Sequence, residues 1–172
     1  MTEAAGFRDE RLEAELCVRG LQPRAAARAF GDLTAYLGQS IEVIAERYWA
    51  YRATDDVAAQ EQVARAREAS AVVAYYHATP HYLYELSYWE ATADKQAWLD
   101  VVARACRRLG LRRLLDYGGG VGGACLALTE RGCACTYVDV GGKTFEYAAW
   151  RFHRHGLGIP TVDIRQGWPR GP

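Results

Sequence analysis

The sequence has no apolar run long enough to cross a membrane and no cationic, apolar leader at its start. It begins Met1-Thr2-Glu3, and an acidic start is not typical of a secretory signal. Its 21 basic and 21 acidic side chains cancel, so no general attraction to nucleic acid or to an anionic membrane is expected. These absences favour a cytoplasmic protein.

The sequence also lacks the spacing of a metal site. Its five cysteines are an odd number without paired metal-ligand spacing, which suits a reducing compartment. Cys133 and Cys135 are two residues apart on a predicted strand, and we expect them to be small buried side chains rather than zinc ligands. His77 and His81 are four apart, but Pro80 interrupts the helix between them. We therefore expect no metal.

Half of the 172 residues are hydrophobic, which is enough for a core. The pattern predicts α/β architecture in two parts: a helical lead-in and lid over 1–110, and a strand-containing part over 111–172. Apolar stripes with helical spacing mark the first two helices, at Ala26, Phe30, Leu33 and Leu37 between Pro23 and Gly38, and then at Ile41, Ile44, Tyr48 and Tyr51 after Ser40.

Three further features complete the helical part. Thr54-Asp55-Asp56 breaks the chain before an alanine-rich helix with Val63, Ala66, Ala69, Val73 and Tyr76 on one side. Pro80 splits the aromatic segment 75–89. In the last helix, Trp98, Val101, Val102 and Ala105 are predicted as the buried face, and Gly110 ends it.

The stretch from Leu114 to Gly123 is the most informative part of the sequence. It predicts a buried strand, starting at about Arg112, that breaks into a glycine-rich turn and then opens a helix. Glycine lets a ligand approach bare backbone amides because it has no Cβ. A second predicted strand, 134–139, ends in Asp139, whose carboxylate can accept hydrogen bonds from ribose hydroxyls. Together they indicate a nucleoside-containing cofactor.

The glycines fit two cofactor patterns. Gly118, Gly120 and Gly123 match the G-x-G-x-x-G dinucleotide fingerprint, so an NAD-dependent oxidoreductase is one alternative. Gly118, Gly120 and Gly122 equally match G-x-G-x-G, preceded by Asp116. A carboxylate beside the turn repels a pyrophosphate but suits the ammonium and sulfonium of S-adenosylmethionine. Asp116 therefore favours S-adenosylmethionine.

Over 113–156, this acid-x-G-x-G-x-G turn and the acid after the next strand resemble the cofactor site of class I S-adenosylmethionine-dependent methyltransferases. The resemblance implies that Asp116, Gly118 and Gly120 surround the methionine part, with Gly122 completing the turn. It implies Asp139 on the ribose and Val140 or Gly141 beside the adenine. The alternatives are purely structural roles: the glycine turn would only pack a helix closely on a strand, and Asp139 would be a helix N-cap.

The resemblance implies a Rossmann-like, doubly wound parallel sheet, of which this sequence holds the first half. A second crossover helix carries Phe145, Ala148, Ala149 and Phe152, and a third strand is predicted at 161–165, followed by Gln166 as a candidate adenine neighbour. We expect strand order third, second, first. The first strand is then an open edge, which predicts an incomplete, poorly active copy or pairing of two copies through that edge.

No catalytic residue is identified by a motif. If the aromatic segment is a lid over the cofactor, His77, His81 and Tyr76 are candidates for a general base, and the methyl acceptor is an unidentified nucleophile. The alternative is an aromatic seam that packs the helices onto the sheet. A third function class, a cofactor-free helical interaction protein, also fits the long helical lead-in.

Overall fold

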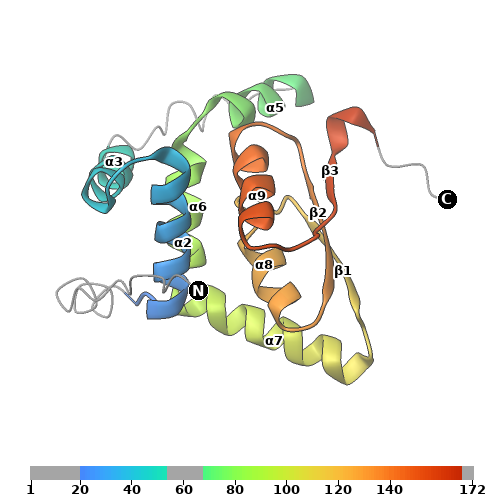
Figure 1. Cartoon of the computed structure of the whole chain (residues 1–172). Helices are drawn as coiled ribbons and strands as arrows, with labels where there is room; N and C mark the ends of the chain where they lie inside the picture. The colour runs from blue at the N-terminus through green and yellow to red at the C-terminus, as the bar shows by residue number, and fades with distance from the viewer. Residues whose placement is uncertain (1–19, 54–67, 168–172) are drawn as a thin grey trace.

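The computed structural model describes residues 20–53 and 68–167, so the expected break at 54–56 and the positions Val63 and Ala66 lie outside the described residues. The described part is mixed α/β (Figure 1). Its elements are α2 (Pro23–Leu37), α3 (Ile41–Ala53), α5 (Ala69–Ala78), α6 (His81–Glu90), α7 (Ala93–Leu109), β1 (Arg113–Tyr117), α8 (Gly123–Glu130), β2 (Ala134–Asp139), α9 (Lys143–Arg154), β3 (Thr161–Asp163) and the 3₁₀ turn η1 (Ile164–Gln166). None of these helices is both long and apolar enough to cross a membrane.

The three strands form one parallel sheet with β2 in the centre. Leu115 of β1 lies opposite Thr136, and Val138 lies opposite Val162 of β3. The predicted strand order and direction are confirmed. The third strand is shorter than predicted: it ends at Asp163, whose side chain accepts a hydrogen bond from the Arg165 backbone N–H (3.0 Å) and turns the chain into η1.

Helices α8 and α9 both cover the same face of the sheet (Figure 1). Beneath them Cys125, Tyr137 and Phe152 are buried in one core, together with residues of α7. The opposite face carries Leu115, which is 55% exposed. Among the described residues, β2 is the sole strand paired with β1, and pairing of two copies through the other edge of β1 stays a prediction.

The N-terminal helices follow the predicted stripes. Gln22 accepts a hydrogen bond from the Ala25 N–H (2.8 Å) at the start of α2, and Gly38 ends that helix in the left-handed conformation. Leu33 is fully buried, and Ile44 of α3 packs in the same core. Pro80 separates α5 from α6 as predicted.

The predicted buried face of α7 is wrong. Trp98 and Val101 are more than half exposed, whereas Leu99, Ala103 and Cys106 are buried against α8 and the sheet. Apolar residues occur at so many adjacent positions of α7 that two overlapping stripes share the helical period. Contact with α8, which the helix's own sequence does not specify, selects the second stripe.

This correction predicts different costs for two neighbouring truncations. Leu99→Ala should lower the free energy of unfolding by about 2–5 kcal/mol, because it leaves a cavity in the core. Val101→Ala should change it by less than about 0.5 kcal/mol, because that side chain faces solvent. Urea unfolding of both variants measures the two free energies. Equal losses of unfolding free energy would contradict the assignment of Leu99 to the buried face and Val101 to the exposed face of α7.

Candidate functional site

The glycine turn joins β1 to α8 at the end of the sheet where β1 and β2 finish. Gly118, Gly120 and Gly122 have φ values of +69°, +55° and +76°, a region that side chains disfavour. The turn is fastened internally: the Gly118 N–H donates to the Val138 carbonyl (2.8 Å) and the Gly122 N–H to the Gly119 carbonyl (2.9 Å). The expectation that these amides are bare is therefore wrong, because they already have acceptors within the chain.

Asp139 lies beside this turn. Its Oδ2 accepts a hydrogen bond from the Gly120 N–H (2.8 Å) and its Oδ1 accepts one from the Val140 N–H (2.7 Å). The Tyr137 hydroxyl donates to the Gly120 carbonyl (2.6 Å) and also lies 3.3 Å from Asp139 Oδ2. The N-cap of α9 is Gly142, so the alternative role of Asp139 as a helix N-cap is excluded.

The side chain of Asp116, on β1, reaches the first turn of α8. Its Oδ2 accepts a hydrogen bond from the Cys125 thiol (3.4 Å), and its carboxylate also accepts one from the Cys125 backbone N–H. Burial raises the pKa of Asp116 above its usual range, although these bonds and the nearby Lys95 ammonium oppose the rise. A carboxylate in this position satisfies donors that a helix N-terminus leaves open.

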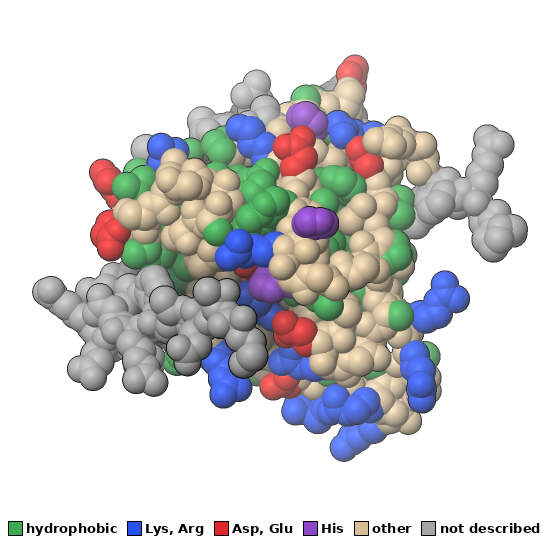
Figure 2. All heavy atoms as spheres, viewed as in Figure 1, with side chains coloured by type: hydrophobic (Ala, Val, Ile, Leu, Met, Phe, Trp, Pro, Cys, Tyr) green, Lys and Arg blue, Asp and Glu red, His purple; other side chains and the backbone are tan. Residues whose placement is uncertain are grey.

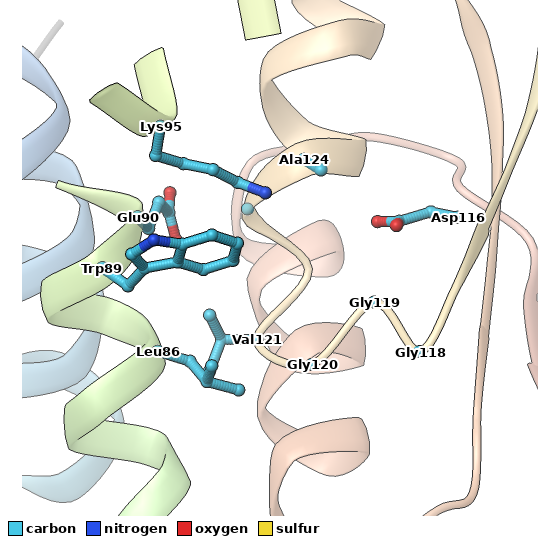
Figure 3. Close-up of a pocket in the computed structure, with 11 residues that line it drawn as sticks. Leu86, Trp89, Glu90, Lys95, Asp116, Gly118, Gly119, Gly120, Val121 and Ala124 are labelled. Atoms are coloured by element: carbon cyan, nitrogen blue, oxygen red, sulfur yellow. The ribbon is translucent and has the colours of Figure 1, made fainter. Parts of the chain in front are cut away.

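A pocket of about 80 Å³ opens between α6, the start of α7 and the glycine turn (Figure 3). It brings together Asp116, Gly118 and Gly120 of the predicted site, whereas Gly122, Asp139 and Val140 lie outside it. Its lining is Leu86, Trp89, Glu90, Lys95, Asp116, Gly118, Gly119, Gly120, Val121, Gly123 and Ala124. Small-molecule sites usually occupy about 300–1,000 Å³, so this pocket has room for one end of a nucleoside cofactor.

Two charged residues of the pocket were not predicted. Lys95 extends across the pocket toward Asp116 (Figure 3), and burial lowers its pKa. Glu90 is buried beside Gly123, where its carboxylate fills the space that a Cβ would take. The available signal was weak: Lys95 is one of two lysines in a chain that otherwise uses arginine and histidine for its basic side chains.

Arg151 of α9 holds Glu90 in place. Its guanidinium makes a bidentate pair with Glu90 (Nη1–Oε2 2.7 Å, Nη2–Oε1 3.0 Å) and a third bond from Nε to Asp32 (2.9 Å). Arg151 Nη1 also donates to the Val121 carbonyl of the glycine turn (2.8 Å). All three side chains are buried. One ion cluster therefore joins α2, α6 and α9 to the turn.

The lid candidates do not line the pocket. His77 lies against the loop after β2, since a Cβ added at Gly142 would come within 2.9 Å of its Cα. Tyr76 packs against Tyr82 with ring centroids 5.1 Å apart. His81 Nε2 lies 2.9 Å from Glu85 Oε2. A role for any of the three as a general base stays a prediction, as does adenine contact by Gln166, which is exposed in η1.

Four cysteines, Cys106, Cys125, Cys133 and Cys135, are buried free thiols, which confirms that Cys133 and Cys135 are buried; Cys135 lies on β2 and Cys133 directly precedes this strand. Across 20–53 and 68–167, no group of three or more histidine, cysteine or acidic side chains is arranged to hold a metal.

Arginines gather at the other end of the sheet from the glycine turn. Figure 2 shows basic side chains clustered at the lower right, below the start of β1, and Arg108, Arg112 and Arg113 are exposed in this region. The charged side chains that line the pocket are Asp116, Glu90 and Lys95. No protein family matches the chain, and neither the curated proteins nor the solved structures yield a match.

Proposed function

We propose that this chain binds S-adenosylmethionine and transfers its methyl group to an acceptor nucleophile. The supporting observation is the carboxylate of Asp116, which lines the pocket and lies against the first turn of α8. A dinucleotide of the G-x-G-x-x-G type places its pyrophosphate at this helix N-terminus. The Asp116 carboxylate there disfavours that anion and favours a ligand with positive charge, whereas the charge of Glu90 is already compensated by Arg151.

The residues present fit the two ends of the cofactor. Asp116 lines the pocket and can bind the ammonium of the methionine part. A Cβ added at Gly118 would have no other atom within 4 Å, so there is open space at this part of the pocket wall. Asp139 can accept hydrogen bonds from the ribose hydroxyls by giving up part of its present bonding to Gly120 and Val140, and we expect Val140 to contact the adenine.

The bound cofactor supplies a methyl group already activated by the positive sulfur. The protein contributes orientation, holding the donor so that the acceptor's oxygen, nitrogen or carbon can approach in line. The buried Arg151 cluster supports this role, because it fixes the Val121 carbonyl and with it the shape of the turn. A general base is optional for this chemistry.

Thermal unfolding with S-adenosylhomocysteine or with NAD tests the proposal. A ligand that binds the folded state at 100 times its dissociation constant adds about 2.7 kcal/mol to stability. We expect S-adenosylhomocysteine to raise the melting temperature and NAD to leave it unchanged. Stabilisation by NAD alone would favour the oxidoreductase, and no effect of either would favour a cofactor-free interaction protein.

Replacing Asp139 should weaken this binding. Asp139→Ala removes the acceptor for the ribose hydroxyls, and we expect a loss of about 1–3 kcal/mol in the binding of S-adenosylhomocysteine measured by calorimetry. Asp100→Ala is the matched control, since Asp100 of α7 is an exposed carboxylate outside the pocket lining that pairs with Arg131 at the end of α8. Equal affinity in the Asp139 variant and the wild type would contradict the assignment.

A further inference from the structure

The position of Lys95 is set by two indole rings. Its Nζ lies 4.0 Å from the ring centroid of Trp89 and 4.3 Å from that of Trp98. An ammonium over an aromatic face is attracted by the ring's quadrupole, most strongly for tryptophan. The flexible lysine side chain is thereby directed over the pocket instead of into solvent.

The three N–H donors of the Lys95 ammonium have no acceptor among the described residues. Of the two carboxylates in the pocket, Glu90 is occupied by its bidentate pair with Arg151 and by Arg28. The Lys95 ammonium forms no ion pair or hydrogen bond with a described residue, although the Lys95 backbone N–H donates to Thr92 Oγ1 at the start of α7 (3.2 Å). Its ammonium has three donors, which a ligand carboxylate can accept.

Asp116 faces Lys95 across the pocket. Figure 3 shows the Lys95 ammonium and the Asp116 carboxylate pointing toward one another from α7 and β1, with Ala124 of α8 beside the gap. A cavity of about 80 Å³ with a cation at one end and an anion at the other suits a small zwitterion. The head group of an α-amino acid has this size and this separation of charges.

We propose that Lys95 selects ligands that end in an amino acid: its ammonium binds the ligand's carboxylate while Asp116 binds the ligand's ammonium. This inference rests on the proposed function, because the amino acid belongs to the cofactor. It adds a residue of α7, outside the glycine motif, that makes the site prefer S-adenosylmethionine and S-adenosylhomocysteine over nucleosides without the amino-acid end. Trp89 and Trp98 are positioning residues, which act by holding the ammonium.

Comparing the affinities of two nucleosides distinguishes recognition of the amino-acid end from binding of the adenosine. S-adenosylhomocysteine and 5′-methylthioadenosine share the adenosine and the thioether, but the second lacks the amino acid. By calorimetry, we expect the wild-type protein to prefer S-adenosylhomocysteine by at least about tenfold, as a charge-assisted pair predicts. Lys95→Met should weaken S-adenosylhomocysteine about tenfold and change 5′-methylthioadenosine less than about twofold, so that the preference disappears.

Two further variants make the result specific to the ammonium. Lys95→Arg keeps the charge and should retain most of the preference, whereas Arg104→Met removes an exposed charge on the same helix and should retain all of it. Equal loss of both nucleosides in Lys95→Met would mean that Lys95 only supports the pocket and would overturn the inference. Unchanged affinity for both would overturn it too, while the proposed function would stand. Failure of both nucleosides to bind the wild-type chain would overturn the proposed function and the inference with it.

Discussion

Replacing Arg151 with methionine should destabilise the folded protein by about 3–5 kcal/mol, as removal of one partner from a buried ion pair does. Methionine fills much of the same volume, but it leaves Asp32 and Glu90 buried without their main cation. The Val121 carbonyl loses a donor as well. Because small proteins are stable by only about 5–15 kcal/mol, the midpoint of urea unfolding should fall sharply.

Arg154→Met is the control for this prediction. Arg154 lies on the same helix and also approaches Asp32, with Nε 3.3 Å from Oδ1, but its side chain is 47% exposed. An exposed pair contributes about 0–1 kcal/mol, so Arg154→Met should change the unfolding free energy little. Similar losses in the two variants would show that the cluster adds no more than a surface pair.

Replacing Gly118 with valine should abolish measurable binding of S-adenosylhomocysteine. Gly118 lines the pocket, and an added Cβ would meet no protein atom, so it would extend into open space that the cofactor is proposed to use. The φ of +69° also disfavours a branched side chain by about 1–2 kcal/mol or more, which would distort the turn. Calorimetry with S-adenosylhomocysteine measures the loss.

Gly110→Val separates the two effects. Gly110 has a φ of +68° and equally open surroundings, but it ends α7 at a distance from the pocket lining. Both substitutions should lower stability by similar amounts, while the Gly110 variant should bind S-adenosylhomocysteine as the wild type does. Undiminished binding by Gly118→Val would exclude the cofactor from that side of the turn.

Local sequence signals predicted the strands, their order and their turns, but the expectation that the first strand is buried is wrong, because no residue of β1 is buried. The second strand was predicted at its observed bounds, because glycines and a helix pattern delimit an apolar run on both sides. The Asp139 carboxylate lies beside the glycine turn because parallel strands bring their carboxyl ends to one edge. Gly38 and Gly110 ended helices as expected, since both adopt the left-handed conformation.

Long-range contacts were not predictable in this way. The exposed face of α7 was misassigned because Trp98 and Leu99 belong to overlapping stripes that only the neighbouring α8 distinguishes. Arg151 is separated from Glu90 by 61 positions and from Asp32 by 119, so no local pattern links them. The proposed role of Lys95 depends on Asp116, which lies across the pocket from it in the folded chain but is distant from it in the sequence.

The hydrogen bond from Arg151 to the Val121 carbonyl couples the conformation of the glycine turn to the packing of the N-terminal helices. Any ligand that reshapes the turn must also work against the packing of α2 and α6, because Asp32 and Glu90 share the same guanidinium. Grafting the strand–turn–helix segment into another scaffold would therefore leave behind the residues that set its shape. Transferring the glycine motif to another protein would transfer its sequence, but the turn would not keep its conformation without Arg151, Glu90 and Asp32.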